Sequence, residues 1–396
     1  MLTLGLLIPS LFWLQGTSLS APLANSIAVP CVSLAIVPLL LLTMMMTPLQ
    51  PAWAADIYRL TERILAGLLD LLQWIDRVLP DFVSLPVGQL SWITLILAGI
   101  AVVWLLSPRG IPQRYLSVLL LLPLVFPSRE APHLSVTFLD VGQGTAVIIE
   151  TPNHVLVYDT GPGFGRRFNA GAHIIAPYLR YRGRATIDHL IVSHADEDHA
   201  GGLTGLIDNM AVGSISSGEP LPTERPVIPC RRGQAWQWDG VHFAILWPLA
   251  AVDSDNLRSE NAESGNNASC VLLITYQGRT ILLPGDIEAV VERRLLATTL
   301  LPGKIDILLA PHHGSRSSSS SAWVKQLSPQ WTVITAGYNS RYGHPHRRVV
   351  DRYLQQRATV LNTATAGALQ FTLNSEDNWQ VTGWRQSYRR YWLTPP

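Results

Sequence analysis

The sequence predicts an α/β fold, an αββα sandwich, preceded by an α-helical transmembrane segment bundle. Three observations favour this fold class. Hydrophobic residues make up 48% of the 396 residues and are densest before about residue 128, in runs of membrane-spanning length. From Leu134 onward, short apolar strands are separated by turns rich in Gly, Pro and Asn. Several of these strands end in His or Asp, which is typical of a layered fold with its chemistry at one sheet edge.

The composition excludes some classes of protein. Only 14% of the residues are charged, which is low for a wholly soluble protein. The formal net charge of +1 predicts no general attraction to nucleic acid, so any such binding has to come from local patches. Cys31, Cys230 and Cys270 are too few for a disulfide-dense scaffold and lack zinc-ribbon spacing.

Candidate membrane helices precede the soluble part as four apolar runs, at residues 2–14, 27–46, 90–106 and 115–126. The second run is uncharged and long enough to span a bilayer, and its two prolines predict kinks. The first run lacks the basic start of a signal peptide, so we expect a membrane helix whose beginning is missing. Buried core helices are the alternative interpretation of these runs.

An amphipathic stretch and a basic loop lie between these runs. Residues 55–79 combine both charge signs with Leu and Ile at helical spacing, which predicts an interfacial helix. Arg109 and Arg114 lie in a short loop, which the positive-inside rule places in the cytoplasm. The chain beyond Pro127 is then expected outside the cytoplasm.

The soluble part is expected to begin as a meander and to continue with strands and helices in alternation. Predicted strands cover residues 134–140, 146–150, 155–159, 186–192, 241–246, 270–276, 280–283, 305–309 and 331–334. Predicted helices cover residues 172–182, 287–296, 321–326 and 348–356, and another begins near residue 202.

The loop that follows the strand 186–192 is the strongest functional signal. His194, Asp196, Asp198 and His199 bring imidazole and carboxylate groups into one short stretch, which can reach two adjacent cations. A solvated polar loop is the alternative, but such a loop has no need of so many ligand-type side chains.

Further ligand-type residues follow later strands. Asp286 comes after an apolar strand, the pair His312 and His313 after another, and His344 and His346 close the set. Taken singly, Asp286 could be a helix N-cap, and either paired histidine could be a hydrogen-bonded edge residue. Together with the 193–199 loop they predict a dinuclear metal site.

These motifs resemble the metallo-β-lactamase superfamily over roughly residues 134–367. More narrowly, they are similar to the soluble domain of ComEC-type DNA internalisation proteins, the multi-pass channels of natural competence. The segments that carry this likeness are residues 138–144, 158–161, 193–199, 283–286 and 312–315. Residues 21–38 and the helices after them are similar to the end of that family's competence membrane domain. The resemblance implies a partial competence domain at 1–128, a metallo-β-lactamase-like domain at 132–370 and a C-terminal extension at 371–396.

The resemblance implies a ligand for each metal. His194 and Asp196 would bind the first ion and Asp198 and His199 the second, while Asp286 would bridge them. His313, or else His312, would complete the second site. The cofactors are thus two divalent metal ions, Mn²⁺ or Zn²⁺, with Mg²⁺ as a further candidate.

This chain departs from the superfamily at two ligand positions. Asp196 stands where the superfamily usually has His, and Asn266 and Asn267 stand where a later His is expected. Oxygen ligands in place of imidazoles shift the preference from zinc towards manganese or magnesium. They also leave the first metal with few protein ligands.

Phosphodiester hydrolysis fits two bridged divalent ions. Asp198 or Asp140 is expected to accept the proton of the attacking water, although Asp140 could instead orient a ligand imidazole. His344 or His346 is placed to donate to the leaving oxygen or to contact phosphate. Asp159 and Gly161 are expected to be structural.

Substrate contacts are expected on both rims of the site. Ser315, Arg316 and Ser317, together with Asn266 and Asn267, are candidate phosphate-binding residues. The serine-rich stretch could equally be a flexible polar loop. An arginine run over residues 166–184 could track a DNA backbone or form a solvated face. A Cys230–Cys270 disulfide fits an oxidising compartment.

The leading hypothesis is a membrane-anchored, metal-dependent nuclease domain that processes DNA outside the cytoplasm during transformation. Its expected partners are single-stranded DNA, the membrane, the remaining channel-forming polypeptide and DNA-receptor proteins. A DNA-guiding or gating module with little turnover is the second hypothesis, and a hydrolase of a small ester or lactam is the third. A full ComEC-type channel has more membrane helices and a β-barrel domain, so the chain is expected to be a truncated or split product.

Overall fold

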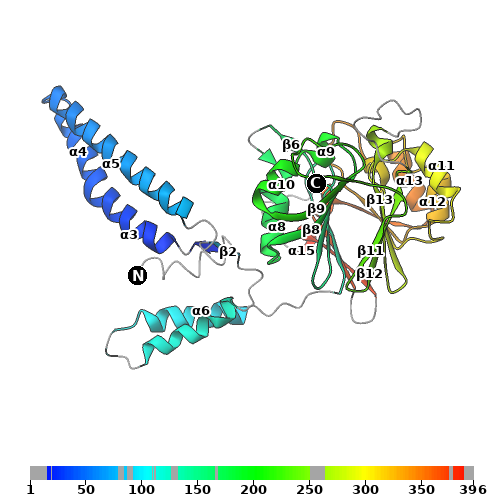
Figure 1. Cartoon of the computed structure of the whole chain (residues 1–396), viewed down its shortest axis with the longest axis horizontal. Helices are drawn as coiled ribbons and strands as arrows, with labels where there is room; N and C mark the ends of the chain where they lie inside the picture. The colour runs from blue at the N-terminus through cyan, green and yellow to red at the C-terminus, as the bar shows by residue number, and fades with distance from the viewer. Residues whose placement is uncertain are drawn as a thin grey trace. The chain divides into compact units, whose positions relative to one another are not determined.

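The computed structural model describes residues 16–18, 20–78, 84–86, 92–108, 110, 113–125, 133–165, 168–249, 264–373 and 378–387. The chain divides into two compact units (Figure 1). The N-terminal unit contains residues 1–129, and the C-terminal unit contains most of residues 130–396.

The N-terminal unit is built from helices. α3 (Ala21–Cys31), a π-helical turn η1 (Val32–Ile36) and α4 (Val37–Met46) follow one another without a break, and α5 (Pro51–Val78) packs alongside them (Figure 1). α5 buries one narrow stripe, Ala54, Thr61, Leu68 and Ile75, which recurs at every second turn. The amphipathic helix predicted at 55–79 is therefore present and begins a turn earlier, at Pro51, a residue that suits a first helical turn.

One helix among the described residues, Leu23–Met46, is long and apolar enough to cross a membrane. α6 (Trp92–Leu105) has 14 residues and is only about 21 Å long, which is short of a hydrocarbon core of about 30 Å. The run predicted at 115–126 forms a 3₁₀ helix, η2 (Arg114–Leu121), and the short α7 (Leu122–Val125). The bundle of several spanning helices is thus not confirmed. The run at 2–14 and Arg109 lie outside the described residues.

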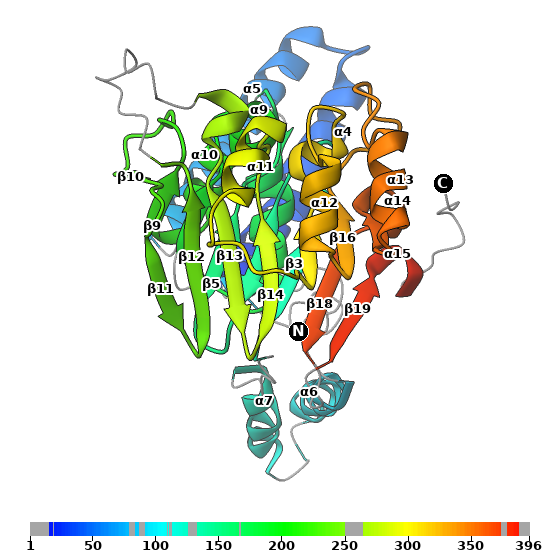
Figure 2. The same cartoon turned by 90° about the vertical axis from the view of Figure 1, so that its right-hand side faces the viewer.

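The C-terminal unit is an αββα sandwich, which confirms the predicted fold class for this part of the chain (Figure 1, Figure 2). The first sheet has the order β10-β9-β8-β5-β4-β3-β18-β19, and the second has β11-β12-β13-β14-β15-β16-β17. α8 (Ala176–Tyr181) and α10 (Leu203–Asn209) cover the first sheet; α11 (Ala289–Leu296), α12 (Ser321–Leu327) and α13 (Arg347–Gln355) cover the second.

The strand bounds, in chain order, fall into two groups. The first sheet contains β3 (Ser135–Phe138), β4 (Val147–Glu150), β5 (Val155–Tyr158), β8 (Thr186–Val192), β9 (Ala211–Ser217), β10 (Ile228–Pro229), β18 (Leu369–Leu373) and β19 (Trp379–Gly383). The second contains β11 (Ala235–Trp238), β12 (Val241–Trp247), β13 (Val271–Tyr276), β14 (Arg279–Leu283), β15 (Ile307–Leu309), β16 (Trp331–Ile334) and β17 (Thr359–Asn362). Two small pairs, β1 (Gly16–Ser18) with β2 (Ser84–Pro86) and β6 (Gly163–Phe164) with β7 (Phe168–Asn169), complete the strands.

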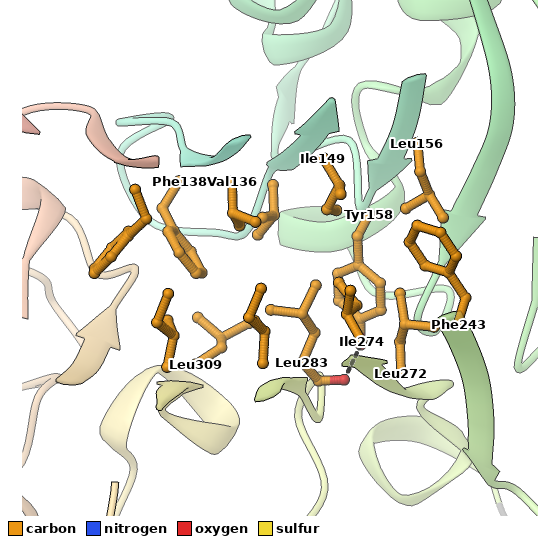
Figure 3. Close-up of a cluster of buried hydrophobic side chains, with 14 of the residues drawn as sticks. Val136, Phe138, Ile149, Leu156, Tyr158, Phe243, Leu272, Ile274, Leu283 and Leu309 are labelled. Carbon is orange, nitrogen blue, oxygen red and sulfur yellow. Dashed lines mark hydrogen bonds between the residues drawn. The ribbon is translucent and has the colours of Figure 1, made fainter. Parts of the chain in front are cut away.

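The central core lies between the two sheets and is shown in Figure 3. Phe138 of the first sheet and Phe243 and Leu283 of the second point into it (Figure 3). The hydroxyl of Tyr158 crosses this layer and donates to the backbone oxygens of Cys270 at 2.7 Å and Leu283 at 3.2 Å. This buried tyrosine ties the sheets together directly beneath the loops that carry the predicted ligands.

Several strands were not predicted, and β9, β18 and β19 are examples. β9 reads Ala-Val-Gly-Ser-Ile-Ser-Ser, which lacks a strong apolar or alternating pattern. β18 pairs with β3 and with β19. The predicted domain boundary at residue 370 therefore falls within the first sheet, which continues into the segment expected to be a C-terminal extension.

Strand direction determines where the functional residues gather. β5, β8 and β9 are mutually parallel in the first sheet, and β14, β15, β16 and β17 are parallel in the second. Residues that follow parallel strands emerge at one edge of a sheet. The loops after β5, β8, β14 and β15, which carry most of the predicted ligands, therefore meet.

Candidate metal centre

The 193–199 loop leaves β8 at the edge of the first sheet and turns into α9 (Glu197–Ala200). Its two histidines, His194 and His199, are both completely buried. Ser193 holds the start of the loop, since its backbone N–H and its hydroxyl donate to Asp159 at 2.6 and 3.0 Å. The loop is thus fixed to the end of β5 before it reaches the site.

Two groups of ligand-type atoms lie side by side at this edge. The first is His194, His199 and Asp286, and the second is Asp198, His199 and His313; within each group the atoms lie within 4.8 Å of one another. Nε2 of His199 lies 3.1 Å from Asp286 Oδ1 and 3.1 Å from His313 Nε2. His199 therefore borders both groups, but its Nε2 can bind only one ion. Asp286, whose Oδ2 lies 3.4 Å from Nε2 of His313, is the residue that can reach both groups.

Hydrogen bonds on the outer side of each imidazole set its tautomer. Nδ1 of His199 donates to Asp159 at 2.7 Å, and Nδ1 of His313 lies 3.3 Å from the Thr335 hydroxyl. The Ser193 hydroxyl donates to Asp159, so it accepts from Nδ1 of His194 at 3.0 Å. Nε2 of each ring then faces the centre, where it is the atom that a metal ion would bind once any proton on it is displaced.

The residues present fit a bound divalent ion. Nε2 of His194 is buried and has no hydrogen-bond partner among the described residues, and such a buried orphan is costly unless a ligand takes its lone pair. Asp286, only 4% exposed, brings a carboxylate into the same space. Neutral imidazoles and carboxylates together are suitable donors for Zn²⁺ or Mn²⁺.

The backbone is held in uncommon conformations around these ligands. His312 and His313 are consecutive residues with φ of 51° and 52°, and Asp159 has φ of 62°. Left-handed non-glycine residues cost free energy and concentrate at functional sites. Gly144 passes so close to the loop that a Cβ would lie 2.3 Å from the backbone oxygen of Asp198.

The electrostatics keep the carboxylates of the centre ionised. Burial would raise the pKa of Asp286, but the positive charges of His199 and His313 hold that pKa well below its usual range. Burial likewise opposes ionisation of Asp198, yet the hydrogen bond from His313 and the charge of His199 lower its pKa. Burial would lower the pKa of His199, but Asp286 and Asp159 raise it well above its usual value. In the absence of metal, protons therefore reside on His199 and His313, whose pKa values, despite burial, are raised by the neighbouring carboxylates, and a metal ion has to displace them.

Asp196 and His312 lie at the margin of the centre. The Asp196 side chain is 57% exposed, and its Oδ2 lies 3.4 Å from Nε2 of His194. Nε2 of His312 lies 3.8 Å from Asp286, and its Nδ1 lies 3.2 Å from the Ser317 hydroxyl. Neither residue belongs to the two ligand groups, so His313 is the paired histidine that the structure brings to the centre.

Asp140 has a different partner from the one proposed for it. Its Oδ2 accepts from Arg385 at 2.7 Å, and its Oδ1 accepts from the backbone N–H of Gly142 at 3.3 Å. The imidazole-orienting carboxylate is Asp159 instead, because Asp159 follows β5 next to β8 while Asp140 follows β3. Gly161, with φ of 66°, has room for no Cβ beside Ala170.

The two downstream histidines occupy different positions. The His344 ring lies 5.6 Å from the His312 ring and 6.2 Å from the His313 ring, so it borders the centre. Nδ1 of His346 accepts from the backbone N–H of Arg348 at 3.2 Å and caps α13. His346 therefore has a structural contact, and His344 is the one beside the candidate ligands His312 and His313.

Some of the predicted phosphate-binding residues are exposed, and others are buried or bonded within the protein. Arg316 and Ser317 are exposed, whereas Ser315 is buried. Asn267 Oδ1 accepts from the backbone N–H of Glu288 at 3.1 Å, and the backbone oxygen of Asn266 accepts from the Ser269 hydroxyl at 2.7 Å. The side chain of Asn267 is thus engaged within the protein, whereas Asn266 is held through its backbone.

The serine-rich loop is anchored from below. The carboxylate of Glu292, which is completely buried, accepts from the backbone N–H groups of Ser319 and Ser320. Burial raises the pKa of Glu292, against the effect of these hydrogen bonds. The flexible-loop alternative does not describe this segment, because its backbone is held by a buried side chain.

The sequence reading missed the residues that hold the ligands. Ser193 and Thr335 contact imidazoles, and the Ser269 hydroxyl accepts from the backbone N–H of Asp286 at 3.0 Å. Glu219 joins two loops, since it accepts from the backbone N–H groups of Ala195 at 3.1 Å and Gly265 at 2.7 Å. In the sequence, these four residues share only one feature, which is that each lies close to a candidate ligand or just after a strand.

A disulfide joins Cys230 to Cys270, which borders the centre through Ser269. Arg184, the last of the predicted basic run, donates to Glu150 and to the backbone oxygen of Thr151, so it is a structural residue. Arg166 and Arg167 lie outside the described residues.

Known proteins resemble both parts of the chain. Residues 139–336 match the metallo-beta-lactamase superfamily, and residues 1–110 match the competence protein family. Competence protein ComA of Neisseria gonorrhoeae is 34% identical over 389 residues, which cover 96% of this chain and 51% of that protein. Recombination protein 2 of Haemophilus influenzae is 31% identical over 389 residues, covering 90% of this chain and 47% of that protein.

Among solved structures, the metallo-beta-lactamase fold protein YhfI from Bacillus subtilis matches with a TM-score of 0.37 and 10% identity, covering 60% of this chain and 99% of that one. The chain spans about half the length of the curated relatives it matches. Two ligand groups at one edge of an αββα sandwich and the match over residues 139–336 lead to one conclusion: the chain belongs to the metallo-beta-lactamase superfamily and joins that domain to a competence protein domain.

Proposed function

We propose that the C-terminal unit is a metal-dependent phosphodiesterase that cleaves DNA as part of a DNA-uptake system. The observation that carries the proposal is the carboxylate of Asp286, whose Oδ1 lies 3.1 Å from Nε2 of His199 and whose Oδ2 lies 3.4 Å from Nε2 of His313. Two adjacent cations are the usual device for displacement at phosphorus. The relatives that match nearly the whole chain are named competence and recombination proteins, which favours DNA as the substrate.

His194 would hold one ion, and Asp198 and His313 would hold the other. His199 would bind one of the two, and Asp286 would offer a carboxylate oxygen to each. Asp196 would swing onto the first ion from its exposed position. Bound there, two divalent cations would supply the Lewis acidity that activates a water and neutralises a phosphodiester. The mixed set of imidazoles and carboxylates favours Mn²⁺ or Zn²⁺, with Mg²⁺ as a weaker candidate.

The protein's own groups complete the site. Asp159 holds the Nδ1 proton of His199, which keeps Nε2 available as a ligand. Asp198, whose side chain is 31% exposed, is ionised at the mouth of the site and accepts the proton of the attacking water. His344, next to the His312 and His313 rings, donates to the leaving oxygen. Asp140 is bound to Arg385 and is less suited to act as the base.

The N-terminal unit would anchor this activity at the cytoplasmic membrane. The apolar helix Leu23–Met46 supports a membrane position, and further spanning segments and a C-terminal unit outside the cytoplasm remain part of the proposal. The remaining channel-forming competence polypeptide is a proposed partner. Single-stranded DNA and DNA-receptor proteins are the other proposed partners.

The test uses the full chain in detergent or nanodiscs with end-labelled single-stranded DNA and Mn²⁺, Zn²⁺ or Mg²⁺. Cleavage should require metal and should be lost in Asp198→Asn and in His313→Gln. Asp351→Asn, which changes an exposed carboxylate of α13, is the matched control and should cleave normally. DNA binding without cleavage under every metal condition would reject the nuclease.

That outcome would instead favour a second function, a DNA-guiding or gating module without turnover. The exposed position of Asp196, which leaves the first group with only three close ligands, is the observation that favours it. Hydrolysis of a small ester or lactam in the absence of DNA cleavage would favour the third hypothesis.

A further inference from the structure

We propose that residues 337–344, the platform loop, stack the bases of a single DNA strand beside the metal centre. The inference rests on the proposed function only in taking DNA as the substrate. The platform loop follows β16 and ends at His344, which borders the metal ligands.

A column of rings runs along this loop away from the centre. The ring of the ligand His313 lies 6.2 Å from that of His344 at an interplanar angle of 27°, and the ring of His344 lies 6.0 Å from that of Tyr342 at 30°. The guanidinium of Arg341 lies 4.8 Å from the Tyr342 ring centroid and donates to its hydroxyl. The column thus connects the metal centre to a flat cationic surface that faces solvent.

The outer members of the platform loop are exposed. Tyr342 is 56% exposed and Tyr338 is 62% exposed, and Arg341 is exposed as well. Both tyrosines therefore leave most of their surface accessible to a ligand. Rings and guanidinium planes are the surfaces on which single-stranded nucleic acids stack their bases.

The platform loop is held in place rather than left free. The side-chain oxygen of Gln143 accepts from the backbone N–H of Gly337 at 3.3 Å and from the Ser340 hydroxyl at 2.9 Å. At the other end, the backbone N–H of His346 donates to the backbone oxygen of Gly314 at 2.9 Å. A preformed platform loses little conformational entropy when it binds a base.

Charge around the platform suits a strand of phosphates. Arg316, Arg341, Arg347 and Arg348 are all exposed and lie on the two loops that flank His312 and His344 or at the start of α13. Such cations contact the backbone without reading sequence. A duplex hides the faces of its bases, so stacking on the platform selects a single strand.

The test compares binding of a base-bearing single strand with binding of an abasic strand of the same length, by fluorescence anisotropy on the full chain in nanodiscs. The wild-type protein should bind the base-bearing strand at least tenfold more tightly. Tyr338→Leu with Tyr342→Leu keeps apolar bulk without the π-face, and should reduce that preference about tenfold. Tyr338→Phe with Tyr342→Phe should preserve it, and Arg357→Leu, which changes an exposed arginine beyond α13, should leave it unchanged.

Equal binding of the two strands by the wild-type protein would overturn the platform, as would an unchanged preference in the double leucine variant. Circular dichroism of that variant ensures that it is folded. Because the readout is a binding ratio, it does not depend on cleavage. Base-dependent binding without DNA cleavage would contradict the nuclease proposal and support the platform loop. DNA cleavage without a preference for base-bearing strands would support the nuclease proposal and contradict the platform loop.

Discussion

Asp159→Asn should weaken metal binding about 10- to 100-fold while leaving every proposed ligand in place. The wild-type carboxylate accepts from the backbone N–H of Ser193 at 2.6 Å and from Nδ1 of His199 at 2.7 Å. An asparagine has one acceptor oxygen, so keeping the Ser193 contact turns its NH₂ group towards His199. The imidazole then has to carry its proton on Nε2, which points at Asp286 at 3.1 Å. Restoring the ligand tautomer against an unsatisfied buried donor costs roughly 1–3 kcal/mol, which matches the expected loss of affinity.

The measurement is competition of the purified full chain with a chromophoric chelator for Zn²⁺ and Mn²⁺. Asp239→Asn is the matched control, because Asp239 also accepts from a histidine Nδ1, that of His154 at 3.1 Å. His154 directly precedes β5 and Asp239 lies in the turn between β11 and β12, so the pair is at the opposite end of β5 from Asp159. Asp239→Asn should bind metal normally. Unchanged affinity in a folded Asp159→Asn protein, or equal losses in both variants, would refute the reasoning.

Three further predictions concern stability. Burial lowers the pKa of His189 to about 4, so this histidine stays neutral in the folded protein but is protonated near pH 6.5 in the unfolded chain. The free energy of unfolding should therefore fall by up to about 3 kcal/mol as the pH drops from about 6.5 to about 4. His189→Asn should flatten that part of a plot of melting temperature against pH, and an unchanged slope would contradict the assignment. Cys230→Ala with Cys270→Ala removes a disulfide between residues 40 apart in sequence and should lower the free energy of unfolding by about 4 kcal/mol, from the chain entropy that the disulfide removes. The loss should be seen as a lower denaturant midpoint. Cys31→Ala, which changes a free cysteine, should leave the midpoint unchanged. Gly144→Ala would push a Cβ to 2.3 Å from the backbone oxygen of Asp198 and should lower both melting temperature and metal affinity, and a neutral effect on metal affinity would show that the loop can move aside.

The strands that could be predicted from pattern are those with continuous apolar runs. The predictions at 186–192 and 331–334 agree with β8 and β16 in both bounds, because each strand ends in three buried and largely apolar residues. β9 and β11 were not predicted. Gly and Ser interrupt the apolar pattern of β9, and β11 has only Trp236 and Trp238 on its inner side. Both form only because neighbouring strands complete their hydrogen bonds.

Side-chain chemistry was enough to select the candidate ligands, because imidazoles and carboxylates at strand ends are rare without a purpose. His194, Asp198, His199, Asp286 and His313 were all candidates before any geometry was known, and all five lie in the two ligand groups. Their metal-binding role remains a prediction. The choice of His313 over His312 needed the backbone of the β15 loop, which turns one ring inward and the other towards Ser317.

Local sequence therefore specified the layers, the ligand loop and the family, because these depend on apolar periodicity and on residue type. The pairing of residues that are distant in sequence depended on the tertiary structure. Asp140 binds Arg385 from 245 residues away, Asp159 takes the place beside His199, and the His194–His199 loop becomes half of a paired centre only when the second sheet brings Asp286 and His313 against it. Hydroxyls such as those of Ser193 and Thr335 have no distinctive pattern in sequence, so only packing could assign them to an imidazole.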